Sequence, residues 1–217
     1  MTNPFDTAKD PVEQKVVTGL LKIGLALKSH AWQDASPKGL TPTQGQILTL
    51  LHSRHSSLRL TEIAEGLAVK PATASDAVVT LVEKGLVKKG KDTEDGRAIS
   101  IALTKAGRIE AESVASWPDF LLAAVDELSE SEQMIFFRCL IKMVRSLQEK
   151  GQIPVSRMCV NCKFFRPNVY PNSELPHHCQ LVNTPFGDRH LRLDCPEHIA
   201  AEPEAANQAW QAFLSQN

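Results

Sequence analysis

Two long stretches of the chain carry apolar residues at the spacing of amphipathic helices. The first covers residues 12–35, and the second follows Ser129, which forms with Glu132 the pattern of a capping box at a helix start. The apolar positions are Val16, Leu20, Ile23 and Leu27 in the first stretch and Met134, Phe137, Leu140, Ile141, Val144 and Leu147 in the second. Each stretch therefore predicts a long helix with one broad apolar face.

Shorter helices are predicted between these two stretches. One begins after Thr41, which opens a second capping box. A short helix over residues 62–67, a tight turn, and a helix over residues 71–84 that ends at Gly85 follow it. Two helices joined by so tight a turn predict a helix-turn-helix.

A β-hairpin is predicted directly after the helix-turn-helix. Residues 87–89 and 98–103 alternate between apolar and polar side chains, and the residues between them are polar and rich in turn formers. Thr104 then caps another helix. A helix-turn-helix followed by a hairpin predicts a winged helix, so the expected fold class is mainly α with a small β component (α+β).

Composition and length are those of an ordinary globular protein. The 217 residues are 42% hydrophobic and 23% charged. No apolar run approaches the roughly 20 residues that a membrane span needs, and the N-terminus lacks the pattern of a signal peptide. We therefore expect a cytoplasmic protein with no membrane partner, in a reducing compartment that disfavours stable disulfides.

The formal net charge of −1 conceals a basic segment. Residues 38–108 contain 11 Lys and Arg against 7 Asp and Glu. The basic residues crowded at its end are Lys84, Lys88, Lys89, Lys91, Arg97, Lys105 and Arg108. A local basic patch is typical of a nucleic-acid-binding surface, although a solvated helix and hairpin can have the same composition.

The second helix of the helix-turn-helix is the part expected to face DNA bases. The candidate DNA contacts are Lys70, Pro71, Thr73, Ser75 and Thr80 on this helix and Lys88, Lys89, Lys91 and Arg97 on the hairpin. Hydroxyl groups bond either to base edges or to phosphates, and Arg97 suits a narrow minor groove. An ion pair of Arg97 with Asp92 or Asp95 is an equal alternative. The residues assigned to the core are Val78, Val79, Leu81 and Val82.

These segments resemble the MarR family of bacterial transcription regulators over roughly residues 12–150. The motifs that carry the resemblance are Leu60-Thr-Glu-Ile-Ala64, Ser75, Leu81-Val-Glu-Lys-Gly-Leu-Val87, and Asp92-Thr-Glu-Asp-Gly-Arg97 with Leu103-Thr104. The resemblance implies an obligate homodimer that reads adjacent major grooves of a palindromic double-stranded DNA operator. The implied organisation is a dimerisation helix in residues 1–37, a winged helix-turn-helix in residues 38–108, and further dimerisation helices in residues 109–152.

Two residues depart from the family pattern. Glu94 stands where the family often has the first arginine of the wing, and Asp76 stands on the recognition helix where a basic residue is common. Both lower the attraction for phosphates that supplies much of DNA affinity. We therefore expect weaker or more salt-sensitive DNA binding, or a contribution from another part of the chain.

Composition changes after residue 152, where proline becomes frequent and helical periodicity fades. Residues 153–199 contain four cysteines with the spacing C-x2-C-x16-C-x15-C, namely Cys159, Cys162, Cys179 and Cys195. This segment has little apolar surface for a core of its own, so four thiolates on a metal centre are predicted to hold it together. The fifth cysteine, Cys139, is expected to be a small buried apolar residue.

The ligand arrangement favours an iron–sulfur cluster, with zinc as the alternative. Four-cysteine zinc sites usually use two C-x-x-C pairs, whereas this segment has one. A proline directly after the last cysteine, here Pro196, also occurs in ferredoxins.

The stretch CVNCKFF, with the later CQLV and DCPEH, resembles the high-potential iron–sulfur proteins over residues 159–198. The resemblance implies a [4Fe-4S] cluster on the four cysteines. The implied apolar wall is Phe164, Phe165, Leu181 and Leu193. Pro196-Glu197 replaces the aromatic residue that this family has beside its last cysteine, so a cluster is implied more strongly than a high potential. Four histidines lie nearby and are expected at the surface or around the ligands, with a ligand role in a mixed site as the alternative: His177, His178, His190 and His198.

Residues 200–217 predict a short amphipathic tail helix, whose Trp210, Phe213 and Leu214 are expected to dock on the cysteine lobe or on a partner subunit.

Together these features predict a MarR-type regulator whose cluster senses redox state, oxygen, nitric oxide or iron by changing the spacing of two recognition helices. A regulator with a structural zinc site, which senses a small aromatic ligand between its dimerisation and DNA-binding parts, stays open. So does an iron–sulfur electron carrier on a dimeric helical scaffold. We predict no enzyme, because the chain lacks a nucleophile motif, a phosphate-binding loop and paired catalytic carboxylates.

Overall fold

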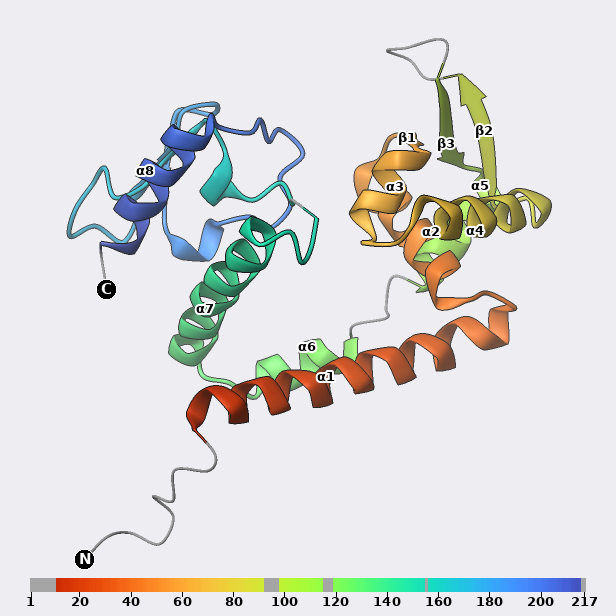
Figure 1. Ribbon diagram of the computed structural model, residues 1–217, viewed down its shortest axis with the longest axis horizontal. Coiled ribbons are helices and arrows are strands. Elements are labelled where there is room, and N and C mark those ends of the chain that lie inside the picture. The colour runs from red at the N-terminus through yellow and green to blue at the C-terminus, as the bar shows by residue number, and fades with distance from the viewer. Residues whose placement is uncertain (1–10, 92–97, 115–118, 155, 216–217) are drawn as a thin grey trace, which may run out of the picture. The chain divides into compact units, whose positions relative to one another are not determined.

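The computed structural model describes residues 11–91, 98–114, 119–154 and 156–215 (Figure 1). The chain divides into two compact units, an N-terminal unit (Met1–Leu122) and a C-terminal unit (Ala123–Asn217). Among the described residues, every helix is too short or too polar to cross a membrane.

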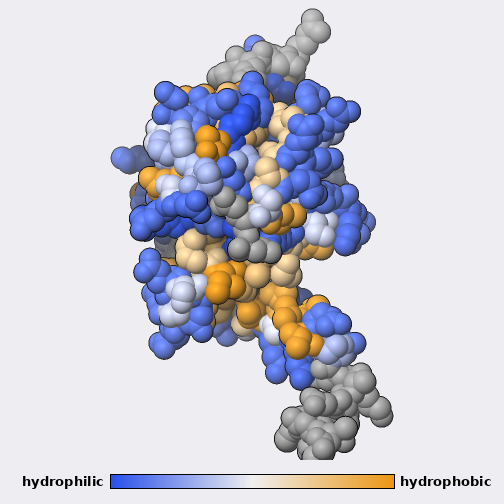
Figure 2. Space-filling view, turned by 90° about the vertical axis from the view of Figure 1, so that its left-hand side faces the viewer, coloured by the Kyte–Doolittle hydropathy of each residue, from blue (hydrophilic) through white to orange (hydrophobic). Residues whose placement is uncertain are grey.

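Helix α1 (Val12–Ala35) opens the N-terminal unit and has the bounds predicted for the first long helix. Its buried residues are Ala31 and Ala35. Many of its larger apolar side chains are exposed, namely Val12, Val16, Val17, Leu21, Ile23, Leu25, Leu27 and Trp32. Apolar side chains are visible at the molecular surface in Figure 2. The apolar face predicted from the sequence therefore exists, but the described part of a single chain leaves it largely uncovered.

A short 3₁₀ turn, η1 (Ser36–Lys38), leads into helix α2 (Pro42–Arg54). The predicted capping box is confirmed, because the Gln44 N–H donates to Thr41 Oγ1 at 3.3 Å and the Thr41 N–H donates to Gln44 Oε1 at 3.1 Å. The two reciprocal bonds satisfy N–H groups that the first helical turn leaves without partners.

Helices α3 (Leu60–Gly66) and α4 (Pro71–Glu83) form the predicted helix-turn-helix. Helix α3 starts two residues earlier than predicted, because the Glu62 carboxylate accepts the Arg59 N–H at 2.7 Å and so closes the first turn there. Beyond the end of α4, Gly85 has a φ of +67°. That left-handed conformation is easy for glycine and reverses the chain toward the hairpin.

The predicted wing is present as an antiparallel sheet of three strands in the order β1-β3-β2. Strands β2 (Val87–Lys91) and β3 (Ile99–Leu103) pair from Val87 opposite Leu103 to Lys91 opposite Ile99, and β1 (Leu58–Arg59) lies on the other side of β3. The hairpin tip, residues 92–97, lies outside the described residues, and so does Arg97. Helix α5 (Lys105–Val114) follows.

One apolar core lies within the N-terminal unit and positions α4. Its fully buried members include Ile47 and Leu48 of α2, Ile63 of α3, and Val78 and Leu81 of α4. Val87, Ile101 and Leu103 of the sheet complete this core. Because α4 is buried along one side only, its other side is left for solvent or a ligand.

The boundary between the two units falls within helix α6 (Asp119–Asp126), and the C-terminal unit then continues into helix α7 (Glu130–Glu149). The predicted capping box at its start is confirmed, because the Ser129 N–H donates to Glu132 Oε2 at 2.9 Å. The 20 residues of α7 form the second predicted long helix.

Short elements form a lobe after α7. They are η2 (Cys159–Asn161), β4 (Phe165–Arg166), β5 (His177–Cys179), β6 (Thr184–Phe186), η3 (Asp188–His190) and α8 (Pro203–Leu214). The three strands make a second antiparallel sheet in the order β4-β5-β6. Irregular segments between these elements carry the polar and proline-rich sequence.

The lobe shares an apolar core with α7 and α8. Buried members are Ile141 of α7, Met158, Val160 and Phe165 near the first two cysteines, Leu191, and Phe213 of α8. Trp210 and Leu214 pack against the same core, which confirms that the tail helix docks on the lobe. The segment therefore shares its core with α7 and α8, which supply apolar surface in addition to its own.

Cys139 differs from the prediction of a buried residue. Its side chain is exposed instead of buried. The buried residues of α7 are Ile141, Arg145 and Gln148, which form a stripe at intervals of four and three residues. Cys139 lies off that stripe.

Candidate nucleic-acid interface and candidate metal centre

The outward side of α4 carries most of the predicted DNA contacts. Lys70, Pro71 and Thr73 are exposed at its N-terminal end, while Ser75 and Thr80 are half-buried. The Thr80 hydroxyl donates to the Asp76 carbonyl oxygen at 3.1 Å, so it is already bonded within the helix. The structure thus places Thr73 and Ser75 better than Thr80 to bond a base edge.

The sequence predicts a core position for Val79, and the structure corrects this, because 43% of the residue is exposed. Val82, at 37%, is likewise only partly covered. Val79 lies three and four residues after Asp76 and Ser75 and so shares their side of α4. An apolar side chain in that place can contact a thymine methyl group. The buried residues Ala74, Val78 and Leu81 are spaced by four and three positions, so they lie on one side of the helix. Val79 is out of step with this spacing, and that is the signal in the sequence that places it outside the core.

The described part of the wing presents lysines. Lys88, Lys89 and Lys91 of β2 are exposed, whereas Val87 at the start of the strand is buried. Successive side chains of a strand point to opposite faces, so Lys89 and Lys91 share one face and Lys88 points to the other. Two of the three ammonium groups are therefore directed to the same side of the sheet.

Lys84 belongs to the predicted basic patch, but its ammonium group makes hydrogen bonds within the N-terminal unit. It donates to the Gly39 carbonyl oxygen and, at 3.3 Å, to Gln44 Oε1. These bonds join the end of α4 to the start of α2. The exposed lysines of the wing therefore supply more of the positive charge available to a ligand than Lys84 does.

The arrangement of α3, α4 and the three-stranded sheet defines a winged helix-turn-helix protein. The sequence profile of the MarR family matches residues 40–99. The transcriptional regulator AdcR of Streptococcus pneumoniae is 31% identical over 117 residues, which cover 52% of this chain and 79% of AdcR. The chain belongs to the MarR family.

Further relatives agree with this membership. The HTH-type transcriptional repressor MdtR of Bacillus subtilis is 33% identical over 103 residues, which cover 48% of this chain and 66% of MdtR. The structure of Staphylococcus aureus MepR in its DNA-binding conformation has a TM-score of 0.56 at 29% identity and covers 61% of this chain and 98% of MepR. A MepR–DNA complex has a TM-score of 0.53 at 28% identity, with 59% and 95% covered.

The four cysteines of the C-terminal unit line one cavity of about 360 Å³. Cys159 opens η2 and Cys162 follows it, Cys179 ends β5, and Cys195 lies on the irregular segment before α8. Sequence spacing alone predicted that these thiols gather, and the structure brings all four to the same hollow.

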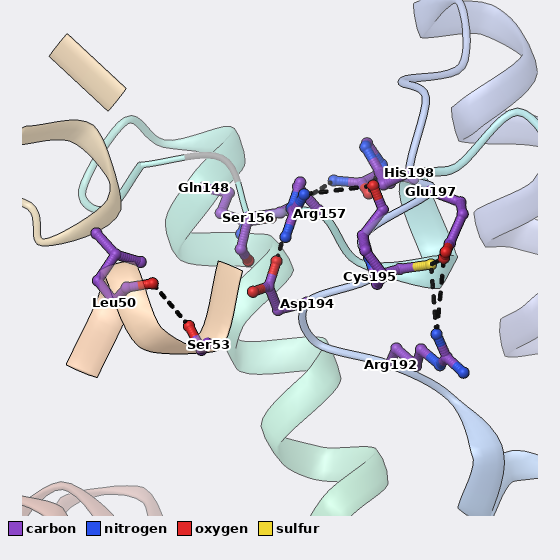
Figure 3. Close-up of polar contacts among 12 residues, drawn as sticks. Leu50, Ser53, Gln148, Ser156, Arg157, Arg192, Asp194, Cys195, Glu197 and His198 are labelled. Atoms are coloured by element: carbon purple, nitrogen blue, oxygen red, sulfur yellow. Dashed lines mark hydrogen bonds and ion pairs between the residues drawn. The ribbon is translucent and has the colours of Figure 1, made fainter. Parts of the chain in front are cut away.

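Apolar side chains form much of the cavity wall. The predicted wall residues Phe164, Phe165 and Leu181 line it, and Val182 and Phe186 join them. Leu193, the fourth predicted wall residue, is not among the lining residues and is 37% exposed. The polar lining includes His190, Arg192 and Glu197, and the last two lie beside Cys195 (Figure 3).

Main-chain hydrogen bonds position the first and last cysteines. The Cys159 N–H donates to the Arg192 carbonyl oxygen at 3.0 Å, and the Arg192 N–H donates to Cys159 Sγ at 3.2 Å. The Cys195 N–H donates to the Arg157 carbonyl oxygen at 2.9 Å. The chain segments around residues 157–159 and 192–195 therefore hold one another in register.

Burial raises the pKa of the Cys159 thiol above its ordinary value. The neighbouring thiols of Cys195, Cys162 and Cys179 add to this rise, because each disfavours a second negative charge nearby, while the Arg192 N–H opposes it. Within the described ranges, no group of three or more His, Cys, Asp or Glu side chains is positioned to hold a metal ion. The four thiols line the cavity without forming the ligand set of a single ion.

Each of the four predicted nearby histidines has a ring hydrogen bond to the protein. His177, only 1% exposed, accepts the Asn168 N–H at Nδ1 and bonds Asp188 Oδ1 through Nε2 at 2.7 Å. His178 bonds Tyr170 and Asn183, and His190 accepts the Gly187 N–H. His198 bonds Asn161, and burial lowers its pKa. Of the four, His190 lines the cavity.

Helix α7 contributes two arginines to the lobe, which sequence reasoning missed. Arg138 bonds Asp188 Oδ2 at 2.8 Å and the Phe213 carbonyl oxygen at 2.9 Å. Arg145, a buried residue, donates to the Val160 carbonyl oxygen at 3.2 Å and to Asn207 Oδ1 at 3.1 Å. These contacts fasten the cysteine-bearing turn and α8 to α7. An arginine at one position of an amphipathic stripe gives no signal of such a role in a single sequence.

Proposed function

We propose that the protein is a transcriptional regulator that binds double-stranded DNA through α4 and the β2–β3 wing. The observation that carries the proposal is the exposed polar side of α4, with Thr73 and Ser75 beside Lys70, on a helix whose opposite side is locked in the core. The DNA complex of the similar protein MepR supports a DNA-binding role for this arrangement.

The uncovered apolar side chains of α1 support a homodimer. Val12 is 72% exposed, Leu21 65% and Leu25 69% in the single chain. Leaving so many apolar groups on one helix in water is unfavourable, at about 25 cal/mol for each Å² of apolar surface. Two copies that cover this surface would carry two recognition helices, which fits a palindromic operator.

Selection from random DNA duplexes, followed by fluorescence anisotropy on the selected sequence, tests the DNA proposal. Thr73→Ala is expected to cost about 1–3 kcal/mol on the selected operator and to relax specificity at one base pair. Lys89→Gln is expected to weaken binding to all sequences and to reduce the salt slope by about 1. Lys150→Gln, in the C-terminal unit, is the matched charge control and should change neither quantity.

A wild-type protein that selects no sequence and binds no duplex would contradict the proposal. In that case an electron carrier on a helical scaffold becomes the better interpretation. If the Lys89 and Lys150 variants lose affinity equally, the protein binds DNA but the wing lysine makes no specific contribution.

We further propose that Cys159, Cys162, Cys179 and Cys195 hold an iron–sulfur cluster of the [4Fe-4S] type. The residues fit such a group, because four soft sulfur ligands and an apolar wall surround one cavity of about 360 Å³. Zinc, the alternative, needs four sulfurs around a single ion at about 2.3 Å. When bound, a cluster of this type supplies one-electron redox chemistry and reactivity toward small oxidants.

Sensing by this site would pass through α7. The first cysteine turn, η3 and α8 are held to α7 by Arg138, Arg145 and a shared apolar core, so a change in the lobe bears directly on this helix. In our proposal, loss of the cluster loosens the lobe, shifts α7 and alters DNA affinity.

The cofactor is tested by anaerobic purification with an ultraviolet–visible spectrum and iron and sulfide analysis. A broad band in the blue with about four irons and four sulfides per chain is the expected result. A colourless protein with about one zinc per chain would replace the cluster by a structural ion. If the loaded and iron-free forms bind the operator with equal affinity across salt concentrations, the cofactor is retained in the proposal but its role as a sensor is contradicted.

A further inference from the structure

Helix α4, the proposed recognition helix, contains acidic side chains and no basic ones. Its sequence is PATASDAVVTLVE, in which the charged residues are Asp76 and Glu83. The commonest specific contact between a protein and a base pair is an arginine or lysine bonded to guanine O6 and N7. No side chain of α4 can make that contact, so its charged groups suit a different base.

Asp76 lies on the outward side of α4. The residue is exposed, whereas the next residue, Ala77, is buried. Thr73 and Val79, one turn before and one turn after Asp76, are exposed as well. Because the helix begins at Pro71, Asp76 belongs to its N-terminal half, the part of a recognition helix that approaches the edges of bases.

In the part of the chain that the structure describes, no hydrogen bond or ion pair engages the Asp76 carboxylate. The Thr80 hydroxyl donates instead to the Asp76 main-chain carbonyl oxygen, at 3.1 Å. A carboxylate that faces DNA is repelled by the phosphates, which lowers affinity for every sequence. A hydrogen bond from a base offsets this repulsion only where the base presents a donor.

Cytosine is the base that matches a carboxylate in the major groove. An ionised carboxylate accepts hydrogen bonds and donates none, and the donors in the major groove are the amino groups of cytosine N4 and adenine N6. Adenine places its N7 acceptor beside that amino group, and this acceptor repels a carboxylate. Guanine and thymine present acceptor oxygens there. A carboxylate in this place therefore favours cytosine over the other three bases.

We propose that Asp76 determines the base specificity of the DNA interface, with its carboxylate accepting a hydrogen bond from the N4 amino group of a cytosine in each half-site of the operator. The inference rests on the proposed DNA binding. Asp76 in this role weakens binding to all other sequences more than binding to the operator, so it increases discrimination. Attraction to the phosphates comes from Lys70 and from the exposed wing lysines Lys89 and Lys91.

The experiment compares wild type, Asp76→Ala and Asp76→Asn by selection from random duplexes. Every half-site cytosine of the wild-type operator is then replaced in turn by the other three bases, and affinities are measured by fluorescence anisotropy. At one of these positions wild type is expected to prefer cytosine by about 5- to 150-fold, the usual effect of one mismatched base pair. Asp76→Ala should lose this preference. Asp76→Asn should transfer it to adenine, because an amide accepts from N6 and donates to N7.

Glu83→Gln is the matched charge control. Glu83 lies seven residues after Asp76, so it is on the same side of α4 but at its C-terminal end. Removal of its charge should raise affinity for all sequences and leave the preference for cytosine as in wild type. Asp76 is exposed, and alanine and asparagine are no worse than aspartate in a helix, so the Asp76 variants are expected to remain folded.

The outcomes separate the two proposals. A wild-type protein that selects no sequence overturns DNA binding and this inference together. A wild-type protein that selects an operator whose cytosine preferences all persist in Asp76→Ala overturns the inference alone. A uniform rise in affinity in Asp76→Asn and Glu83→Gln alike, with unchanged base preferences, does the same, because Asp76 then acts through its charge only.

Discussion

Asp188 is the residue that joins α7 to the interior of the lobe. Its two carboxylate oxygens bond the buried His177 ring at 2.7 Å and the Arg138 guanidinium at 2.8 Å. We expect Asp188→Asn to lower the unfolding free energy of the C-terminal unit by about 1.5–3 kcal/mol, the range for hydrogen bonds to charged groups. Urea unfolding followed by Trp210 fluorescence measures it, and Asp126→Asn, at an exposed position in the same unit, should change it by less than about 0.5 kcal/mol.

The same residue predicts a pH dependence. The hydrogen bond from His177, followed by the bond and charge of Arg138, lowers the pKa of Asp188 below its ordinary value. A lowered folded-state pKa means that the stabilisation is complete above the unfolded value of about 3.9 and is lost as the pH falls through the folded value. The stability difference between wild type and Asp188→Asn should therefore be constant near neutral pH and shrink below about pH 4. A difference that grows on acidification would contradict this assignment.

At the scale of elements, Gly107 fixes how α5 approaches the start of the wing. A Cβ atom at this position would lie 1.8 Å from the Leu86 carbonyl oxygen, which also accepts the Thr104 N–H at 3.0 Å. Because the obstacle is main chain, Gly107→Ala must displace α5 or β2, and we expect a loss of about 1–3 kcal/mol or more in stability. The melting temperature of the intact protein measures the loss.

Gly45 in α2 is the matched control for this substitution. A Cβ atom there meets no atom within 4 Å. Alanine removes the entropic cost of glycine inside a helix, so Gly45→Ala should be neutral or stabilising by about 0.5–1 kcal/mol. Equal destabilisation by the two substitutions would mean that contact with Leu86 is not the cause.

Helices whose start or apolar period is encoded within a few neighbouring residues were predictable from the sequence. Side-chain roles that depend on partners far along the chain were not. The capping boxes at Thr41 and Ser129 and the apolar period of α1 are encoded within a few residues, so these helices begin where the pattern indicates. The exposure of Val79 follows from which side of α4 meets the core. The roles of Arg138 and Arg145 depend on partners 50 to 75 and 15 to 62 residues away. One sequence contains no record of such pairings.

At the scale of the whole molecule, the two units have separate apolar cores. The N-terminal core contains residues from Ala35 to Val114, and the C-terminal core residues from Phe137 to Leu214. Cysteine spacing predicted that the four thiols gather, and they line one cavity. The packing of α7 and α8 on the core of the lobe was beyond the sequence pattern, because any amphipathic helix can cover a lobe of short elements. Because the cores are separate, we expect removal of the proposed cluster to destabilise the C-terminal unit alone.

A ligand that binds the folded form stabilises the region to which it is bound. Residues that share an apolar core with that region unfold together with it and are stabilised most. Hydrogen exchange with peptide-resolved mass spectrometry should therefore show faster exchange in the iron-free protein for residues 156–195, α8 and the part of α7 around Arg145. Peptides of α2, α3 and β3 should exchange at the same rate with and without iron. Faster exchange throughout both units would mean that the cluster stabilises the chain as one cooperative body, and unchanged exchange around Cys159 and Cys195 would remove the cluster from this site.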